Sequence, residues 1–145
     1  MLCGHIETLE ERVDHLIQLR SLQDETGGFM AIVPLVFHPE HTKLEKLPMI
    51  EPEERLLNIA VSRLMLDNFD HIKAYWIQVG PELCQKALWC GADDMDGTIV
   101  DERITHMAGA RSPRGLVEAA IQKHIRDAGR TPVRRDALYN ELVTV

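Results

Sequence analysis

Apolar and polar positions recur at helical intervals in two long segments of the chain. Residues 8–26 begin with Thr8 and Glu11 in the spacing of a capping box, continue with an apolar stripe and end at a Gly-Gly pair. Residues 53–68 also carry apolar side chains at helical spacing along one face. Both segments are therefore predicted to be amphipathic helices.

Three other segments have the pattern of strands. Residues 29–37 are wholly apolar, which predicts a strand buried on both faces, with Pro34 either interrupting its hydrogen bonds or marking a bulge. Residues 71–79 are rich in β-branched and aromatic side chains and predict a second strand. Residues 92–100 predict a third strand, which its three aspartates weaken.

Further helical segments follow these strands. Residues 81–91 start with a proline and end with a glycine, residues 112–129 start at Ser-Pro and end at a glycine, and residues 130–143 are expected to pack as a final turn or helix. Strands that alternate with helices imply right-handed βαβ units and a parallel sheet. Such a sheet is either open and doubly wound or closed into a barrel.

The length of the chain bears on this choice. An eight-stranded barrel takes about 250 residues, so 145 residues supply about half of one. The predicted fold is α/β, with the C-terminal half of a parallel (β/α) barrel in residues 1–110 and a C-terminal helical extension in residues 111–145. Because the chain starts inside a predicted strand, we expect the N-terminal half-barrel to be missing. The exposed sheet edge then favours either that half or a second copy of the chain as partner.

Composition narrows the function classes. The net charge of −7 repels phosphate backbones and anionic lipid, which disfavours nucleic acid and membranes as partners and leaves a small-molecule substrate. No segment reaches the roughly 20 apolar residues of a membrane span, and the N-terminus has no signal-peptide pattern. The odd, scattered set Cys3, Cys84 and Cys90 argues against disulfides and predicts a reducing, cytoplasmic setting without a metal site.

Candidate site residues come from one geometric rule. In a parallel α/β fold, polar residues just after each strand define the functional face. These positions predict a set of substrate-binding residues, without any assigned catalytic residue: His5, Glu7, His38, Glu40, Thr42, Tyr75, Asp96 and Thr98.

Each of these positions also has a structural interpretation. His5 and Glu7 can cap the first helix, and His38 can be a hydrogen-bonded loop histidine. The acidic residues around Asp96 can cap and turn the chain, and Arg134-Arg135-Asp136 favours a solvated or salt-bridged tail over an anion site. Phosphate-binding and nucleophile-elbow motifs do not occur in the sequence.

Four segments together resemble a known family. GHIETLEERVDHLIQLRSLQDETGGF, PLVFHPEHT, AVSRLMLDNFDHIKAYWIQVGPELCQKALWCGADDMDGTIVDERITHMAGA and AGRTPVRRDALYN are similar to the C-terminal half of aminofutalosine synthases, which are radical S-adenosylmethionine enzymes of the futalosine route to menaquinone. Cyclic dehypoxanthinyl futalosine synthase and the tyrosine-using FO synthase subunit share the barrel and parts of these motifs. A non-catalytic half-barrel that binds a ligand or partner is a further alternative.

The resemblance implies a chemistry for the full-length protein. A [4Fe-4S] cluster cleaves S-adenosylmethionine, and the resulting 5′-deoxyadenosyl radical adds to 3-[(1-carboxyvinyl)oxy]benzoate, which leads to 6-amino-6-deoxyfutalosine. The family holds the cluster with three cysteines in a C-x-x-x-C-x-x-C motif. Cys3, Cys84 and Cys90 do not have that spacing. The resemblance therefore implies a fragment that is inactive alone and that forms the substrate side of the barrel.

Overall fold

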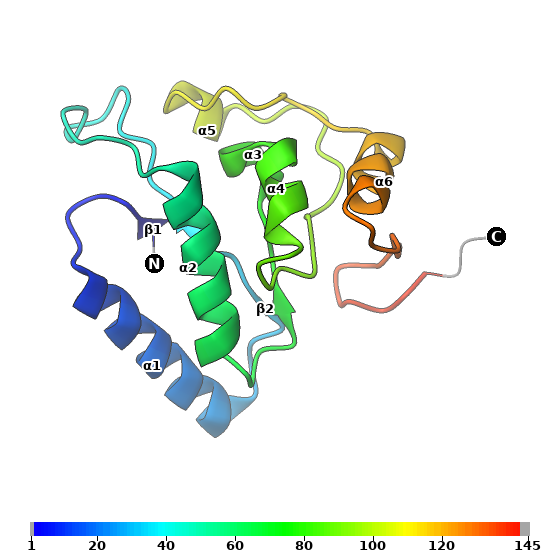
Figure 1. Cartoon of the computed structure of the whole chain (residues 1–145), viewed down its shortest axis with the longest axis horizontal. Coiled ribbons are helices and arrows are strands. Elements are labelled where there is room, and N and C mark those ends of the chain that lie inside the picture. Colours follow the sequence, from blue (N-terminus) through cyan, green and yellow to red (C-terminus); the bar gives the residue numbers. More distant parts are fainter. Residues whose placement is uncertain (1, 143–145) are drawn as a thin grey trace.

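The computed structural model describes residues 2–142 and has a mixed α/β architecture. In Figure 1, α1 and α2 run side by side, α3 and α4 lie at the centre, and α6 lies on the opposite side from α1. None of the helices in residues 2–142 is long and apolar enough to cross a bilayer. The elements in chain order are β1 (Leu2–Cys3), α1 (Leu9–Thr26), β2 (Ala31–Ile32), β3 (Leu35–Val36), α2 (Pro52–Met65), β4 (His71–Ile72), α3 (Trp76–Val79), α4 (Pro81–Ala87), α5 (Ile104–Met107) and α6 (Glu118–Asp127).

The two long helices are where the sequence places them. At the start of α1, the Glu11 N–H donates to Thr8 Oγ1 (3.2 Å) while the Thr8 N–H donates to Glu11 Oε2 (2.7 Å), so the predicted capping box is confirmed. The helix ends at Gly27, whose left-handed backbone (φ 58°) suits glycine. The second helix, α2, begins at Pro52 and already ends at Met65, earlier than expected.

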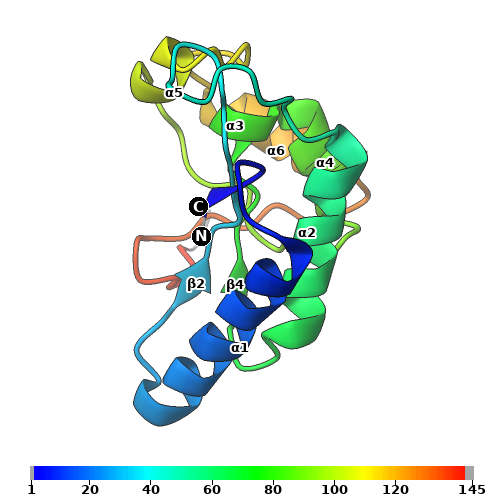
Figure 2. The same ribbon diagram turned by 90° about the vertical axis from the view of Figure 1, so that its left-hand side faces the viewer.

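The apolar run at residues 29–37 does not form one continuous strand, and its two extended pieces pair with different strands. It divides on either side of Pro34 into β2 and β3, as the proline suggested. The first piece, β2, pairs in parallel with β4, and β3 pairs in parallel with β1; Figure 2 shows β2 beside β4. Parallel strands joined through helices are thus confirmed, but only Val36 of these two pieces is buried, so burial on both faces is wrong for the rest.

The strand predicted at residues 71–79 stops early. Only β4 and an isolated parallel bridge between Lys73 and Asp94 are extended, and the chain then turns into α3 at Trp76. Tertiary packing overrides the strand preference of this segment, because the Trp76 ring is fully buried and its Nε1–H donates to Gly97 O at 3.1 Å. Gly80, at φ 85°, then separates α3 from α4.

Residues 92–100 form no strand and contain only two isolated bridges, a parallel one at Asp94 and an antiparallel one at Ile99, so this prediction is wrong. The cause lies in the aspartates. The Asp96 N–H donates to Asp94 Oδ1 (2.7 Å), and Asp96 has φ 68°, a conformation that leaves the extended ladder.

The helix expected from residue 112 also begins later, with α6 at Glu118. The Leu116 N–H donates to Ile99 O, which keeps that residue extended, and the Ser112 hydroxyl donates to Ile77 O instead of capping a helix. Gly129 (φ 70°) follows the end of α6 as predicted. The tail up to residue 142 forms a turn and not a helix. The division of the chain at residue 110 stays a prediction.

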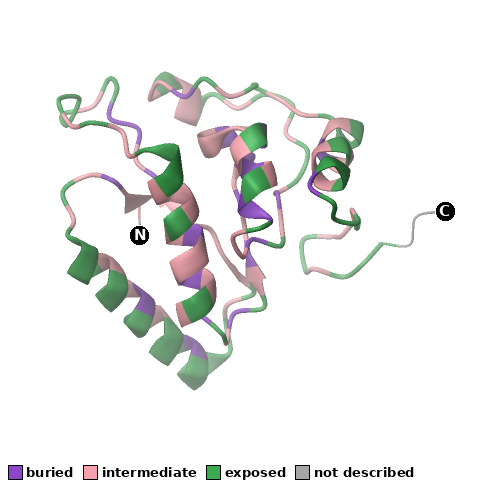
Figure 3. Ribbon diagram, viewed as in Figure 1, coloured by how far each residue is buried: buried purple, intermediate pink, exposed green. Residues whose placement is uncertain are grey.

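The core lies between the helices and one face of β4. Ile72, Ala74 and Trp76 are buried against α2, α4 and α6, whereas His71 and Lys73 are only half-buried. We call the face that carries His71, Lys73 and Tyr75 the open face, because side chains alternate along an extended chain and the helices pack on the other side. Figure 3 shows buried residues gathered on α4 and on the inner side of α2, while most of α1 is exposed.

Candidate functional site

The open face brings two of the predicted site residues together. Lys73 Nζ lies 3.1 Å from Asp96 Oδ1, in an ion pair whose side chains are mostly buried. Tyr75 lies on the same face, and burial, followed by the negative charges of Glu102 and Asp96, raises the pKa of its hydroxyl. Tyr75 and Asp96 therefore lie near each other, and no sequence pattern pointed to Lys73, the partner of Asp96.

A second cluster, which we call the tail clasp, ties the C-terminal tail to the open face through Asp94, Arg135, Tyr139 and His71. The Asp94 side chain is only 9% exposed and accepts hydrogen bonds from Arg135 Nε (3.0 Å) and from the Tyr139 hydroxyl (2.8 Å). The Tyr139 ring stacks on His71 with 3.7 Å between centroids, and the Arg135 guanidinium lies 4.1 Å from the Tyr139 centroid. Burial and Asp94 raise the pKa of Tyr139. The expected salt-bridged tail is confirmed.

Replacing Arg135 by glutamine is expected to release the tail. Asp94 then loses a charge-assisted partner, which costs about 1.5–3 kcal/mol. Chymotrypsin should cut the variant after Tyr139 several-fold faster than the parent chain. Arg134→Gln, at an exposed neighbouring position, is the matched control and should leave the cleavage rate unchanged. Equal cleavage of the two variants would contradict the tail clasp.

His5 and Glu7 do not cap α1, which Thr8 does instead. The Glu7 carboxylate accepts hydrogen bonds from the Gly4 N–H (2.6 Å), the His5 N–H (2.9 Å) and Arg12 Nε (2.7 Å). Burial opposes ionisation of Glu7, but these hydrogen bonds prevail and hold its pKa at about 2. The carboxylate thus organises the turn between β1 and α1, and contact with a substrate stays a prediction.

The loop after β3 carries three of the predicted residues. His38 is buried and its Nε2 lies 3.2 Å from Gln78 O, which agrees with a hydrogen-bonded loop histidine. Thr42 Oγ1 donates to Pro39 O (2.7 Å) and accepts from the Leu44 N–H (3.0 Å), so its hydroxyl stabilises a turn.

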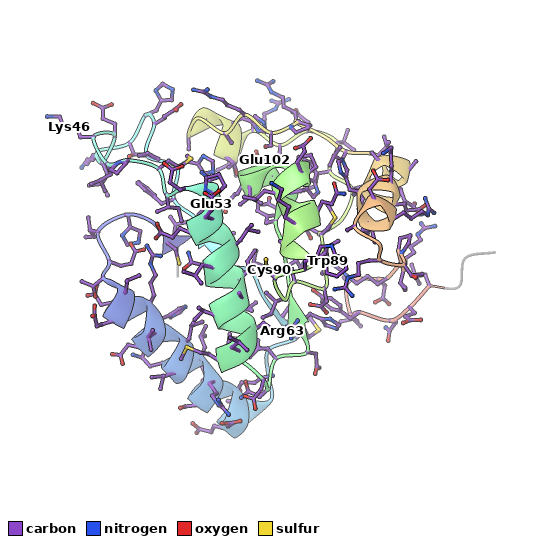
Figure 4. The ribbon with its side chains drawn as sticks, viewed as in Figure 1. Lys46, Glu53, Arg63, Trp89, Cys90 and Glu102 are labelled. Carbon is purple, nitrogen blue, oxygen red and sulfur yellow. The ribbon has the colours of Figure 1, made fainter. Side chains whose placement is uncertain are left out.

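Glu40 and Thr98 have different surroundings. The Glu40 carboxylate packs against Gly109, whose Cβ, if present, would overlap it. Thr98 is exposed and lines a groove of about 840 Å³ between residues 92–98, α6 and the tail. Arg63, on α2 (Figure 4), borders this groove. It joins α2 to the turn beyond α4, because its Nε donates to Gly91 O at 2.8 Å.

Sequence reasoning missed the pair Glu102 and His106, which acts electrostatically on Tyr75 of the open face and on His38 of the loop after β3. Glu102 Oε2 lies 2.9 Å from His106 Nδ1, and His106 Nε2 lies 2.7 Å from Ser112 O. Hydrogen bonding to Ser112 and to Glu102 raises the pKa of His106. Glu102 acts electrostatically on Tyr75, and His106 acts on His38. The spacing of four between Glu102 and His106 was the available signal.

The residues described here do not fit an iron–sulfur cluster. Cys84 is buried, and burial raises the pKa of its thiol, which disfavours the thiolate that binds metal. Cys3 lies in β1 and Cys90 lies after α4, next to Trp89 (Figure 4). Within residues 2–142, no group of three or more cysteine, histidine or acidic side chains is placed to hold a metal ion.

Short parallel strands with covering helices, and polar side chains after the strands, place the chain among α/β proteins. A profile of the CofH/MqnC C-terminal region matches residues 26–144, and the chain belongs to this family. The resemblance predicted from the sequence is thereby confirmed.

Three relatives illustrate the family. The chain is 53% identical to aminodeoxyfutalosine synthase of Thermus thermophilus over 98% of the chain and 39% of that protein. It is 41% identical to aminodeoxyfutalosine synthase of Streptomyces coelicolor, over 98% of the chain and 40% of that protein. It is 36% identical to 5-amino-6-(D-ribitylamino)uracil–L-tyrosine 4-hydroxyphenyl transferase 2 of Methanosarcina barkeri, over 100% of the chain and 40% of that protein. The chain thus spans about two fifths of the length of these relatives.

Proposed function

We propose that the chain is the C-terminal portion of a radical S-adenosylmethionine enzyme that makes 6-amino-6-deoxyfutalosine for menaquinone biosynthesis. The observation that carries this proposal is the 53% identity to an aminodeoxyfutalosine synthase over nearly the whole chain, against 36% and 41% to two L-tyrosine 4-hydroxyphenyl transferases over the same region. The proposed substrates are S-adenosylmethionine and 3-[(1-carboxyvinyl)oxy]benzoate, as the sequence resemblance implied, and the proposed compartment is the cytoplasm.

Within that enzyme, the chain is proposed to supply one wall of a parallel barrel. The open face of β4, with Lys73, Tyr75 and Asp96, would line the interior, because the helices cover its other side. Its proposed task is to hold the substrate and exclude water while the reaction proceeds. The [4Fe-4S] cluster and most of the S-adenosylmethionine site would belong to an N-terminal half-barrel, which is also the proposed partner of the sheet edges.

A chimera tests this proposal directly. The matching C-terminal segment of the Thermus thermophilus relative is replaced by this chain, and the product is assayed with S-adenosylmethionine and 3-[(1-carboxyvinyl)oxy]benzoate. We expect 6-amino-6-deoxyfutalosine by mass spectrometry, at a rate within about tenfold of the parent enzyme, since identity is high over the whole exchanged segment. The isolated chain should form no product, because its described residues do not fit the cluster.

Two control substrates separate the alternatives. Dehypoxanthine futalosine tests the cyclase, and L-tyrosine with 5-amino-6-(D-ribitylamino)uracil tests the hydroxyphenyl transferase. Turnover of either control in preference to the enol ether would refute the assignment. A folded chimera that turns over none of the three would favour a non-catalytic half-barrel.

A further inference from the structure

One buried atom among the candidate site residues has no partner. His38 is only 7% exposed, and its Nδ1 makes no hydrogen bond to any atom of residues 2–142. Asn68 Oδ1 is also buried without a hydrogen-bond partner, but the Asn68 Nδ2 group donates to Arg20 O and to Asp24 Oδ1, away from the strand ends. The Thr42 hydroxyl and the Glu7 carboxylate already have partners. A buried polar atom without a partner is costly, so His38 Nδ1 requires an explanation.

The position of the His38 ring is fixed by its surroundings. Nε2 lies 3.2 Å from Gln78 O, and the Gln78 side chain in turn accepts the Val36 N–H at 2.9 Å. His38 is thereby tied both to the end of β3 and to α3. A ring held in this way presents Nδ1 in a defined direction without further rearrangement of the side chain.

These contacts also fix the tautomer. A carbonyl oxygen only accepts hydrogen bonds, so Nε2 must carry the proton and Nδ1 of the neutral ring carries a lone pair. Burial is the largest effect and lowers the pKa of His38; the hydrogen bond to Gln78 and the charge of Glu40 oppose it, and the nearby Arg55 and His106 act in the same direction as burial. The ring is therefore neutral near pH 7, and Nδ1 can accept a hydrogen bond but cannot donate one.

The charge of the surroundings selects the type of donor. A carboxylate has no proton to give to Nδ1, so the two carboxylates of the proposed enol-ether substrate do not fit. An ammonium group has protons, but Arg55 and His106 already place positive charge near the ring. A neutral hydroxyl satisfies both conditions. Of the two proposed substrates, only the nucleoside carries hydroxyl groups; its adenine amino group is a second neutral donor, which 2′,3′-dideoxyadenosine, lacking only the hydroxyls, distinguishes from them.

We infer that His38 Nδ1 accepts a hydrogen bond from a ribose hydroxyl of the nucleoside substrate, and so orients the nucleoside at the end of β3. The identity of the ligand in this inference rests on the proposed function. Residues 102–112 border this position, since Ser112 donates to Ile77 O beside Gln78 and Gly109 packs on Glu40. Because Nδ1 is buried, this segment must shift when the hydroxyl enters.

Nitrogen NMR on the chain labelled with ¹⁵N-histidine is the test, with adenosine as the probe. In the free chain, the His38 signals should show a proton on Nε2 and a lone pair on Nδ1. Adenosine should move the Nδ1 signal upfield, as a new hydrogen bond does. 2′,3′-Dideoxyadenosine, which lacks the two ribose hydroxyls, should bind at least about tenfold more weakly, because a buried acceptor is then left unpaired.

The possible results separate this inference from the proposed reaction. A Nδ1 signal already typical of a hydrogen bond in the free chain would indicate a trapped water and overturn the inference, as would the absence of adenosine binding. Equal binding of the two nucleosides would overturn it as well. In the chimera, His38→Phe should raise the KM for S-adenosylmethionine at least about tenfold. An inactive chimera with intact adenosine binding at Nδ1 would refute the reaction alone.

Discussion

Replacing Trp76 by alanine is expected to lower the free energy of unfolding by about 3–5 kcal/mol. Trp76 is 0% exposed and packs in the core with Ile72 and Cys84, so truncation leaves a large cavity. It also removes the Nε1–H donor of Gly97 O, which loses its hydrogen bond to the indole. Denaturant titration followed by circular dichroism measures the change, provided that the dependence on denaturant stays equal in both chains.

The chain offers a matched control, because its only other tryptophan is Trp89. That residue is 68% exposed and stacks with Arg130, with 4.4 Å between the guanidinium carbon and the ring centroid. Trp89→Ala should therefore cost no more than about 1 kcal/mol. Trp76→Phe keeps most of the packing and should fall between the two. A Trp76→Ala effect no larger than that of Trp89→Ala would contradict the described core.

Prediction from the sequence worked where the determinants were local. The capping box of Thr8 and Glu11 and the glycine at residue 27 define α1 by contacts within a few residues. Pro34 divides its strand because it has no N–H to donate, which is a property of the residue itself. Both features follow from backbone chemistry that any fold must respect.

Prediction failed where distant residues decide the local structure. Trp76 belongs to a segment with strand preference, but its ring is buried in the core and its indole N–H donates a hydrogen bond to the carbonyl of Gly97, 21 residues away. The Ser112 hydroxyl likewise pairs with a carbonyl 35 residues earlier. Such long-range contacts cannot be derived from periodicity, and they shift the ends of α3 and α6.

The candidate site shows the same division. The rule that polar residues after strands gather at one end selected His38, Tyr75 and Asp96, whose binding of a substrate stays a prediction. It did not select Lys73, which pairs with Asp96 from the position directly after β4, or Tyr139, which reaches the open face from the tail. Tail residues carry no strand signal, so their contribution becomes visible only once the chain is folded.

The ionisation of Glu7 is expected to make the free energy of unfolding depend on pH in the acidic range. Its pKa of about 2 in the folded chain lies below the ordinary value of 4.5, so its contribution to stability is complete above about pH 4.5 and is lost as the pH falls through 2. The difference corresponds to about 3 kcal/mol. The Glu7 side chain is only 4% exposed, so solvent screens its hydrogen bonds with Gly4, His5 and Arg12 only weakly.

Glu7→Gln should therefore remove about 3 kcal/mol at pH 7 and flatten the loss of stability between pH 4.5 and 2. The side-chain amide keeps the size of glutamate but turns an NH₂ group towards donors or leaves one of them unpaired. Arg12 keeps its second partner, Glu54, at 2.7 Å, so the helix pair α1–α2 should remain docked. Glu10→Gln, an exposed change in the first turn of α1, is the control and should alter stability by less than about 0.5 kcal/mol. An unchanged acid profile in Glu7→Gln would show that the buried carboxylate does not stabilise the turn between β1 and α1.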